Sequence, residues 1–259
     1  MPTILFNEII FGPVRSRRLG VSLGVNLLPV NGKVCTFDCI YCECGFNQDG
    51  KTSSQLPSAE KVKEALEKKL KKMKEAGDEL DVITFAGNGE PTLHSKFSTI
   101  IDDTIELRDR YFPAAKVSVL SNATMIRRES VFAALKKVEN NILKIDTPFD
   151  GQLHLIDRPV SSSFQVRDLV EQIKRFEGNV IIQTMFLTGE YEGKRIDNTS
   201  DEEITAWIEI LKEINPKQVM IYTIERETPA KSLQKVSLGK LNQIADKVRR
   251  EGFSVSVSG

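Results

Sequence analysis

All four cysteines of the chain lie between residues 35 and 44. The first three, Cys35, Cys39 and Cys42, form a C-x3-C-x2-C motif, and Cys44 follows two residues later. Thiolates this close together are typical ligands of a soft metal ion or an iron–sulfur cluster. Structural zinc is the alternative, although zinc sites ordinarily combine two separated pairs of ligands and this sequence has no second pair. Three ligands would leave one iron of a four-iron cluster open to a small molecule, with Cys44 as a free thiol beside it.

Glycines and short polar residues follow three predicted strands, namely Gly87, Asn88, Gly89, Glu90, Pro91, Ser121, Asn122 and Asp146. Glycines allow a backbone to approach a ligand closely, and a carboxylate such as that of Glu90 suits a cation. Taken alone, the Asn88-Gly89 pair also fits an ordinary turn. Asp146 shares one face of its strand with Lys144, so these two residues either line a binding site or form an interior ion pair.

Short β-type runs alternate with helical patterns along the chain, and these elements must position the residues above. The runs, mostly rich in Val and Ile, are Val21–Leu28, Asp81–Phe85, Lys116–Leu120, Asn141–Ile145, Val180–Phe186 and Gln218–Thr223. Helical patterns lie at about 58–75, 95–110, 129–138, 165–176, 201–213 and 239–250. Ser58 is expected to cap the first helix, and Gly77 to follow its end. Phe253–Val257 is expected to add an edge strand.

Strands that alternate with helices predict βαβ units and a parallel sheet. Crossovers of one hand curl such a sheet, and six repeats favour an α/β fold of the partial (β/α)6, TIM-type barrel kind. Connections after strands are long, as at Pro29–Pro57, Asp146–Phe164 and Leu187–Ser200, whereas those after helices are short. Because active sites of parallel α/β folds lie at the carboxyl ends of strands, we expect the site there, with a cluster-binding loop at about residues 29–57.

The composition limits the classes of function. In 259 residues, 36 Lys and Arg balance 36 Asp and Glu, which argues against a disordered tail protein and a strongly basic nucleic-acid coat. No stretch approaches the ~18 apolar residues of a membrane helix, and the first ten residues lack the features of a signal peptide. We therefore expect a cytoplasmic protein with no membrane association. Without a linker, a repeat or a low-complexity tract, residues 1–259 are expected to form a single domain.

The cysteine motif, with Tyr41 before its last cysteine, resembles that of the radical S-adenosylmethionine (SAM) superfamily. The resemblance implies that Cys35, Cys39 and Cys42 hold a [4Fe-4S] cluster whose fourth iron is chelated by SAM. It implies reductive cleavage of SAM to a 5′-deoxyadenosyl radical, which abstracts a hydrogen atom from a substrate.

The same resemblance extends to the strand ends. Residues Gly87 to Pro91 are similar to the superfamily's Gly-Gly-Glu-Pro motif, which holds the SAM ammonium, with Asn88 in place of its first glycine. Ser121 and Asn122 would then contact the ribose and the carboxylate of SAM. Asp146 and Tyr41 would complete the cofactor site.

Two outer stretches give a narrower resemblance. They are similar to compact iron–sulfur oxidoreductases grouped with wyosine-base synthases that act on tRNA. One stretch is Phe11–Gly20, which contains Arg15, Arg17 and Arg18, and the other is Ile221–Pro229, which contains Arg226. Arg15, Arg17 and Arg18 would either meet an anionic substrate or pair with the protein's own carboxylates. Arg226 follows a predicted strand and is expected to face the mouth of the active site, where it could bind substrate. The substrate stays open between a tRNA base and a partner protein activated by glycyl-radical formation. An external electron donor of the flavodoxin or ferredoxin type is implied. From another class, a non-catalytic metal-binding or electron-carrying module is the alternative.

Overall fold

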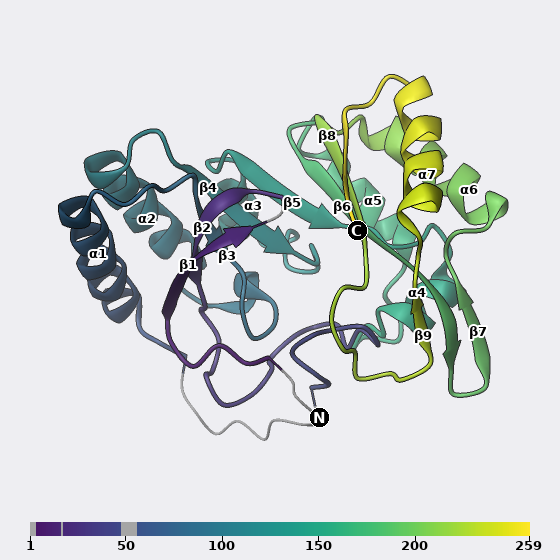
Figure 1. Cartoon of the computed structure of the whole chain (residues 1–259), viewed down its shortest axis with the longest axis horizontal. Coiled ribbons are helices and arrows are strands. Elements are labelled where there is room, and N and C mark those ends of the chain that lie inside the picture. The colour runs from purple at the N-terminus through teal and green to yellow at the C-terminus, as the bar shows by residue number, and fades with distance from the viewer. Residues whose placement is uncertain (1–3, 17, 48–55) are drawn as a thin grey trace.

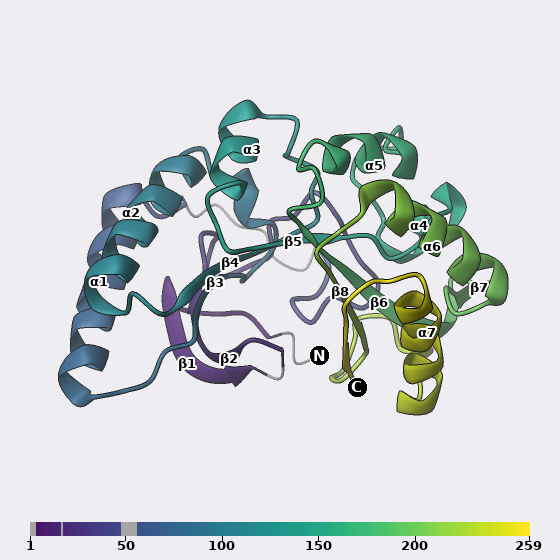
Figure 2. The same ribbon diagram turned by 90° about the horizontal axis from the view of Figure 1, so that it is seen from above.

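The computed structural model describes residues 4–16, 18–47 and 56–259. Its centre is a sheet with seven parallel strands in the order β2 (Gly20–Val25), β3 (Val82–Phe85), β4 (Lys116–Ser121), β5 (Asn140–Lys144), β6 (Ile181–Tyr191), β8 (Gln218–Thr223) and β10 (Val255–Ser258). Seen from above, this sheet curls into an open half-barrel with the helices on its outer side (Figure 2). The predicted partial barrel is therefore confirmed, and the predicted edge strand is β10.

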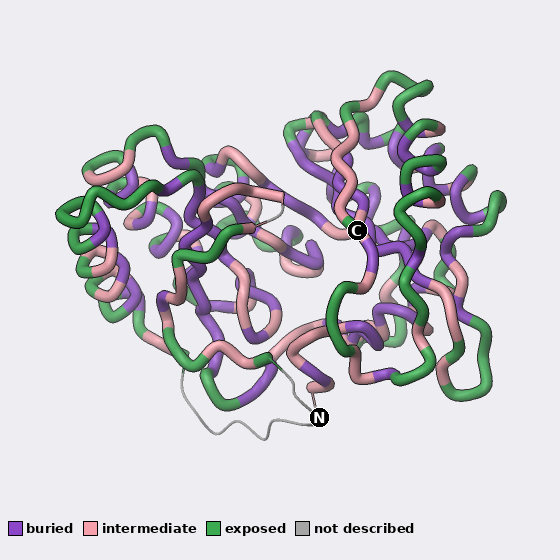
Figure 3. Tube along the Cα trace, in the orientation of Figure 1, coloured by how far each residue is buried: buried purple, intermediate pink, exposed green. Residues whose placement is uncertain are grey.

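Six helices connect these strands, close to the predicted ranges: α1 (Ala59–Ala76), α2 (Phe97–Tyr111), α3 (Glu129–Leu135), α5 (Val166–Lys174), α6 (Asp201–Ile214) and α7 (Leu238–Arg250). The predicted cap of α1 is confirmed, because Ser58 Oγ accepts a hydrogen bond from the backbone N–H of Lys61. Gly77 ends the helix in the left-handed conformation, at φ 74°. The buried stripe of each helix faces the sheet, as the purple segments of the tube show (Figure 3).

The structure also contains elements that the sequence patterns did not predict. Strand β1 (Ile10–Ser16) pairs antiparallel with β2, and helix α4 (Asp150–Ile156) occupies part of the long connection after β5. Strand β6 continues to Tyr191 and pairs antiparallel with β7 (Lys194–Asp197) and β9 (Leu233–Lys235). The interpretation of Leu187–Ser200 as a loop was therefore wrong, since most of it forms the β6–β7 hairpin (Figure 1).

Along the strands, the side chains inside the half-barrel change from apolar to polar. A small apolar cluster of Ile142, Ile181 and Met220, with Leu19 and Leu120 against it, fills its inner layer. Farther toward the carboxyl ends, strands β5, β6 and β8 place polar side chains such as Lys144, Gln183 and Tyr222. Polar side chains therefore gather toward the carboxyl edge of the sheet, where the sequence predicts the site. Within the described parts of the chain, no helix is both long and apolar enough to cross a membrane.

Candidate functional site

The cysteine loop, the connection that follows β2, is fixed against the carboxyl edge of the sheet. Glu90 N donates to Val34 O at 3.1 Å, which pairs the loop with the segment after β3. Ile40 N donates to Ile156 O at 3.0 Å, and Ile40 O accepts from Ala230 N at 3.1 Å. The loop thus spans from the strands of the first half to the elements of the second half (Figure 1). Residues 48–55, in the predicted range 29–57, lie outside the described residues.

Two of the three predicted cluster ligands receive N–H donors on sulfur. Cys35 Sγ lies 3.5 Å from Phe37 N and 3.6 Å from Asn122 Nδ2, and Lys144 Nζ lies 3.0 Å from Cys39 Sγ. Burial raises the pKa of the Cys35 thiol to about 12 in the metal-free protein. A bound metal centre would have to displace this proton, and the surrounding donors favour the thiolate that results.

Cys42 and Cys44 lie side by side in the loop. A hydrogen bond from Cys44 is the main cause that lowers the pKa of the Cys42 thiol to about 6. Cys44 Sγ also lies 3.4 Å from Gly87 O. The structure thus places Cys44 next to a predicted ligand and to the glycine-containing strand end.

The donor set fits an iron–sulfur cluster. In residues 4–16, 18–47 and 56–259, no three His, Cys, Asp or Glu side chains converge as ligands of one metal ion would. Three buried or half-buried thiols lie on one anchored loop, with N–H donors at two of them, and cysteine thiolates are the usual ligands of such a cluster.

Both glycines of the segment after β3 are required by close approach of other chain segments. A Cβ atom on Gly87 would lie 2.3 Å from Asn26 Oδ1. Gly89 has φ +130°, and a Cβ atom there would lie 1.9 Å from Val34 O in the cysteine loop. Gly89 is therefore the position at which the cysteine loop meets the sheet, and a side chain at this position would separate the two.

Asn88, which replaces the first glycine of the Gly-Gly-Glu-Pro pattern, is completely buried. Its Nδ2 donates to Phe6 O at 2.9 Å and to Pro29 O at 2.8 Å, and its Oδ1 accepts from Phe6 N at 2.9 Å. These bonds account for the departure from the pattern, because the Asn88 side chain anchors the segment before β1.

Glu90 joins the ends of β3 and β4. Its carboxylate is 2% exposed and accepts hydrogen bonds from Thr92 N (3.1 Å), the Thr92 hydroxyl, Ser121 Oγ (2.8 Å) and Asn122 N (2.7 Å). Burial raises the pKa of this carboxyl group. Pro91 then begins the short 3-10 helix η1 (Pro91–Leu93), with Glu90 as its N-cap. The contact between Glu90 and the SAM ammonium stays a prediction, whereas its role in positioning Ser121 and Asn122 is visible.

Asp146 and Lys144 form the interior ion pair that the strand pattern allowed, with 3.3 Å between Nζ and Oδ2. The pair is part of a larger group. Tyr41 OH donates to Asp146 Oδ2, and Lys144 Nζ lies 2.5 Å from Asp157 Oδ1. Burial raises the pKa of Asp157 to about 7. Asp157 was not predicted as a site residue, because it follows helix α4, which the sequence patterns did not reveal.

A cavity of about 540 Å³ opens on the inside of the half-barrel. Its lining residues include three arginines, Arg15, Arg18 and Arg226. Arg18 Nη1 donates to Gln183 Oε1 at 2.9 Å, and its guanidinium lies 4.6 Å from the ring centre of Tyr222. Arg226 pairs with Glu43 at 2.6 Å. Arg226 therefore forms an ion pair with a carboxylate of the protein, whereas Arg18 bonds to an amide, and both line the cavity. Arg17 lies outside the described residues.

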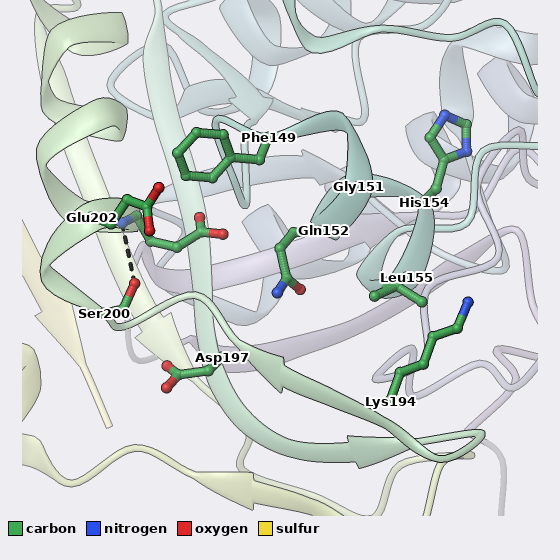
Figure 4. A pocket seen from close by; sticks show the side chains of 10 residues that line it. Phe149, Gly151, Gln152, His154, Leu155, Lys194, Asp197, Ser200 and Glu202 are labelled. Carbon is green, nitrogen blue, oxygen red and sulfur yellow. Dashed lines mark hydrogen bonds between the residues drawn. The ribbon is translucent and has the colours of Figure 1, made fainter.

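A second cavity, of about 660 Å³, lies beside α4, β7 and the start of α6 (Figure 4). Its lining includes Phe149, Gln152, Lys194 and Glu203, and contains none of the predicted site residues. The predicted residues gather instead around the cysteine loop at the carboxyl edge of the sheet.

Comparison with known proteins agrees with this geometry. Residues 32–197 match the profile of the radical SAM superfamily. A protein named GTPase Obg from Brachyspira hyodysenteriae is 30% identical over 223 residues, which is 85% of this chain and 30% of that protein. A UPF0026 protein from Methanocaldococcus jannaschii is 29% identical over 241 residues, 91% of this chain and 70% of its own length. The crystal structure of Streptococcus suis SuiB bound to SAM superposes with a TM-score of 0.64 at 16% identity, covering 88% of this chain and 49% of SuiB.

The chain therefore belongs to the radical SAM superfamily. It spans less than a third of the first of these relatives and about half of SuiB. Members of this superfamily are generally enzymes, and membership implies SAM and a [4Fe-4S] cluster as cofactors. The likeness to SuiB is one of fold.

Proposed function

We propose that this chain is an enzyme that holds a [4Fe-4S] cluster through Cys35, Cys39 and Cys42 and cleaves SAM reductively. The observation that carries the proposal is the docking of the cysteine loop on the segment after β3, through the backbone hydrogen bonds of Val34 with Asn88 and Glu90. This contact brings Cys35 Sγ next to Asn122, and Cys44 Sγ next to the backbone of Gly87. Two separate motifs of the sequence thereby become one site.

With both cofactors bound, the cluster held by Cys35, Cys39 and Cys42 would supply one electron, taken from an external flavodoxin- or ferredoxin-type donor, for cleavage of SAM. SAM would supply methionine and the 5′-deoxyadenosyl radical that takes a hydrogen atom from the substrate. The protein's part is to bind, to orient and to exclude water. Phe37, Ile40 and Tyr41, all nearly inaccessible to solvent, provide a dry wall on the cysteine loop. Glu90 fixes Ser121 and Asn122 at the end of β4.

The cavity on the inside of the half-barrel supports a substrate with an anionic group. Three arginines and one glutamate, Glu43, are its charged lining residues, and Arg18 is already oriented by Gln183 and Tyr222. Guanidinium groups bind carboxylates and phosphates bidentately. A tRNA nucleotide and an acidic segment of a partner protein both carry such groups. Mass spectrometry of nucleosides in bulk tRNA from a deletion strain separates them, because an unchanged profile removes the tRNA substrate.

The class of function is tested by anaerobic reconstitution with iron and sulfide. The wild-type protein should be brown, its reduced-cluster electron paramagnetic resonance signal should shift with SAM, and dithionite should yield 5′-deoxyadenosine. Cys35→Ala should lose the product, whereas Cys44→Ala, two residues beyond the motif, should keep the cluster. A colourless protein with stoichiometric zinc, or a cluster unresponsive to SAM, would instead support the metal-binding or electron-carrying module.

A further inference from the structure

Two lysines, one buried and one partly buried, flank the cysteine motif. Lys144 Nζ lies 3.0 Å from Cys39 Sγ, and its side chain is 12% exposed. Lys33 is 4% exposed, and its Nζ donates to Gly45 O at 3.0 Å inside the same loop. Of the two, Lys144 alone has a hydrogen bond to a motif sulfur among the contacts of the described residues.

The surroundings of Lys144 are dry and strongly charged. The side chains of Asp146 and Asp157, its two carboxylate partners, are 0% and 1% exposed. The rings of Tyr41 and Phe37 lie 4.7 and 5.4 Å from Nζ. One cation therefore stands between two carboxylates and a thiol that a cluster would convert to a thiolate.

The charge of the ammonium bears directly on electron transfer. Reduction adds one negative charge to a cluster, and a neighbouring positive charge stabilises the reduced form, more strongly inside a protein than in water. Hydrogen bonds to ligand sulfurs act in the same direction, because they withdraw electron density from the metal centre. A nearby carboxylate has the opposite effect.

We propose that Lys144, through its contact with Cys39 Sγ, is a positioning residue that raises the reduction potential of the cluster, and that Asp157 opposes it. This inference rests on the cluster of the proposed function. It gives the Lys144–Asp157 pair a role in electron entry from the external donor, in addition to the structural role of an ion pair.

The test is a redox titration of the reconstituted protein without SAM, followed by electron paramagnetic resonance at pH 8.5. Asp157→Asn is the reference background, because asparagine cannot take up a proton that would mask the loss of the ammonium. In this background Lys144→Gln should shift the reduction equilibrium at least tenfold toward the oxidised form, which is about 59 mV for a one-electron couple. Lys144→Arg should stay within threefold of the background. Asp157→Asn by itself should shift the equilibrium toward the reduced form relative to wild type.

Lys217→Gln in the same background is the matched control. Lys217 lies before β8, at the amino edge of the sheet, where its Nζ donates to Glu139 O and Asn179 Oδ1. The Lys217→Gln substitution removes the same charge far from the cysteine loop and should leave the reduction potential of the cluster unchanged.

The inference would be overturned if the cluster in the Lys144→Gln variant had the same reduction potential as the cluster in its Asp157→Asn background. If the Lys144→Gln variant took up no cluster, the comparison of Asp157→Asn with wild type would decide. Equal reduction potentials in these two proteins would refute the role of the Lys144–Asp157 pair. A wild-type protein that took up no cluster would refute the proposed function itself, and the two failures are thus distinguishable.

Discussion

At the scale of single residues, the carboxylate of Glu90 organises the site more than any other side chain described, because donors from two strand ends converge on it. Glu90→Gln replaces one accepting oxygen by an N–H donor that would face other donors. Unpaired buried polar groups cost about 1–3 kcal/mol each. Chemical unfolding of the metal-free variant should show a loss of stability of this size.

Glu43→Gln is the control for that measurement. Glu43 forms a partly exposed ion pair with Arg226, and such pairs contribute about 0–1 kcal/mol. If both variants lost the same stability, the organising role of Glu90 would be refuted.

Glu203 makes the stability of the fold depend on pH. Burial is the main cause that raises its pKa from 4.5 to about 7, and Thr147 Oγ1 donates to its carboxylate at 2.8 Å. A carboxyl group with a raised folded-state pKa binds more protons in the folded state than in the unfolded state. Stability should therefore fall as the pH rises from about 4.5 to about 7, by on the order of 1–3 kcal/mol.

Thermal or chemical unfolding at pH 5 and pH 8 measures this dependence. Glu203→Gln should reduce it, while Asp157 continues to contribute in the same direction. Glu202→Gln, an exposed neighbour in the same cavity (Figure 4), should retain most of the wild-type dependence, because the charge of Glu202 is a smaller cause of the raised pKa of Glu203 than burial. A wild-type protein that was more stable at pH 8 than at pH 5 would contradict the assignment.

Sequence patterns marked the candidate site residues but not their partners. The cysteines and the Gly87–Pro91 segment stand out by spacing and residue type, and the fold brings them together. Lys33 and Asp157 carry no such signal, since a lone lysine or aspartate in a loop is usually solvated. Asp157 meets the cysteine loop only in the folded molecule, where its backbone O accepts from Asp38 N at 2.9 Å, and Lys33 Nζ donates to Gly45 O within the folded loop.

At the scale of elements, the joint between the cysteine loop and the sheet tolerates no side chain at Gly89. Gly89→Ala should move the loop off the strand end, so that the reconstituted protein holds less iron than wild type and loses more than about 1 kcal/mol of stability. Iron content and unfolding together measure the effect.

Gly77→Ala supplies the comparison. Gly77 also has a positive φ, of 74°, but no atom lies within 4 Å of an added Cβ. This variant should carry only the backbone strain of about 1 kcal/mol and keep its full iron content. Equal iron loss in both variants would show that the contact between Gly89 and the cysteine loop is not the cause of the loss.

The regular elements were predictable because each has a long or strongly apolar pattern. The elements that the sequence patterns did not predict are short or polar. Helix α4 has seven residues, and the β7 sequence Lys-Arg-Ile-Asp is mostly charged. Strand β1 contains Pro13 and exposes Val14 and Arg15. Such segments form through pairing with neighbours, which local periodicity does not encode.

At the scale of the whole molecule, the two edges of the sheet should respond differently to SAM. Added to cluster-loaded protein, SAM should slow hydrogen exchange of backbone amides in residues 86–93, 121–126 and 145–149, which follow β3, β4 and β5. The connections 77–81 and 112–115, before β3 and β4, should be unaffected. Protection confined to those connections would place the SAM site elsewhere.

The anchoring of the cysteine loop to residue 230 also has a consequence for biosynthesis. The three thiols precede that last hydrogen-bond partner by nearly two hundred residues. A ribosome adds roughly 5–20 residues per second, so the motif leaves the ribosome roughly ten to forty seconds before its final support exists. During this interval the nascent chain carries all three thiols on an incompletely supported loop. The complete framework of the loop is thus available only after residue 230 has been synthesised, and a fragment that ended before helix α4 would contain the whole cysteine motif without the framework that holds it.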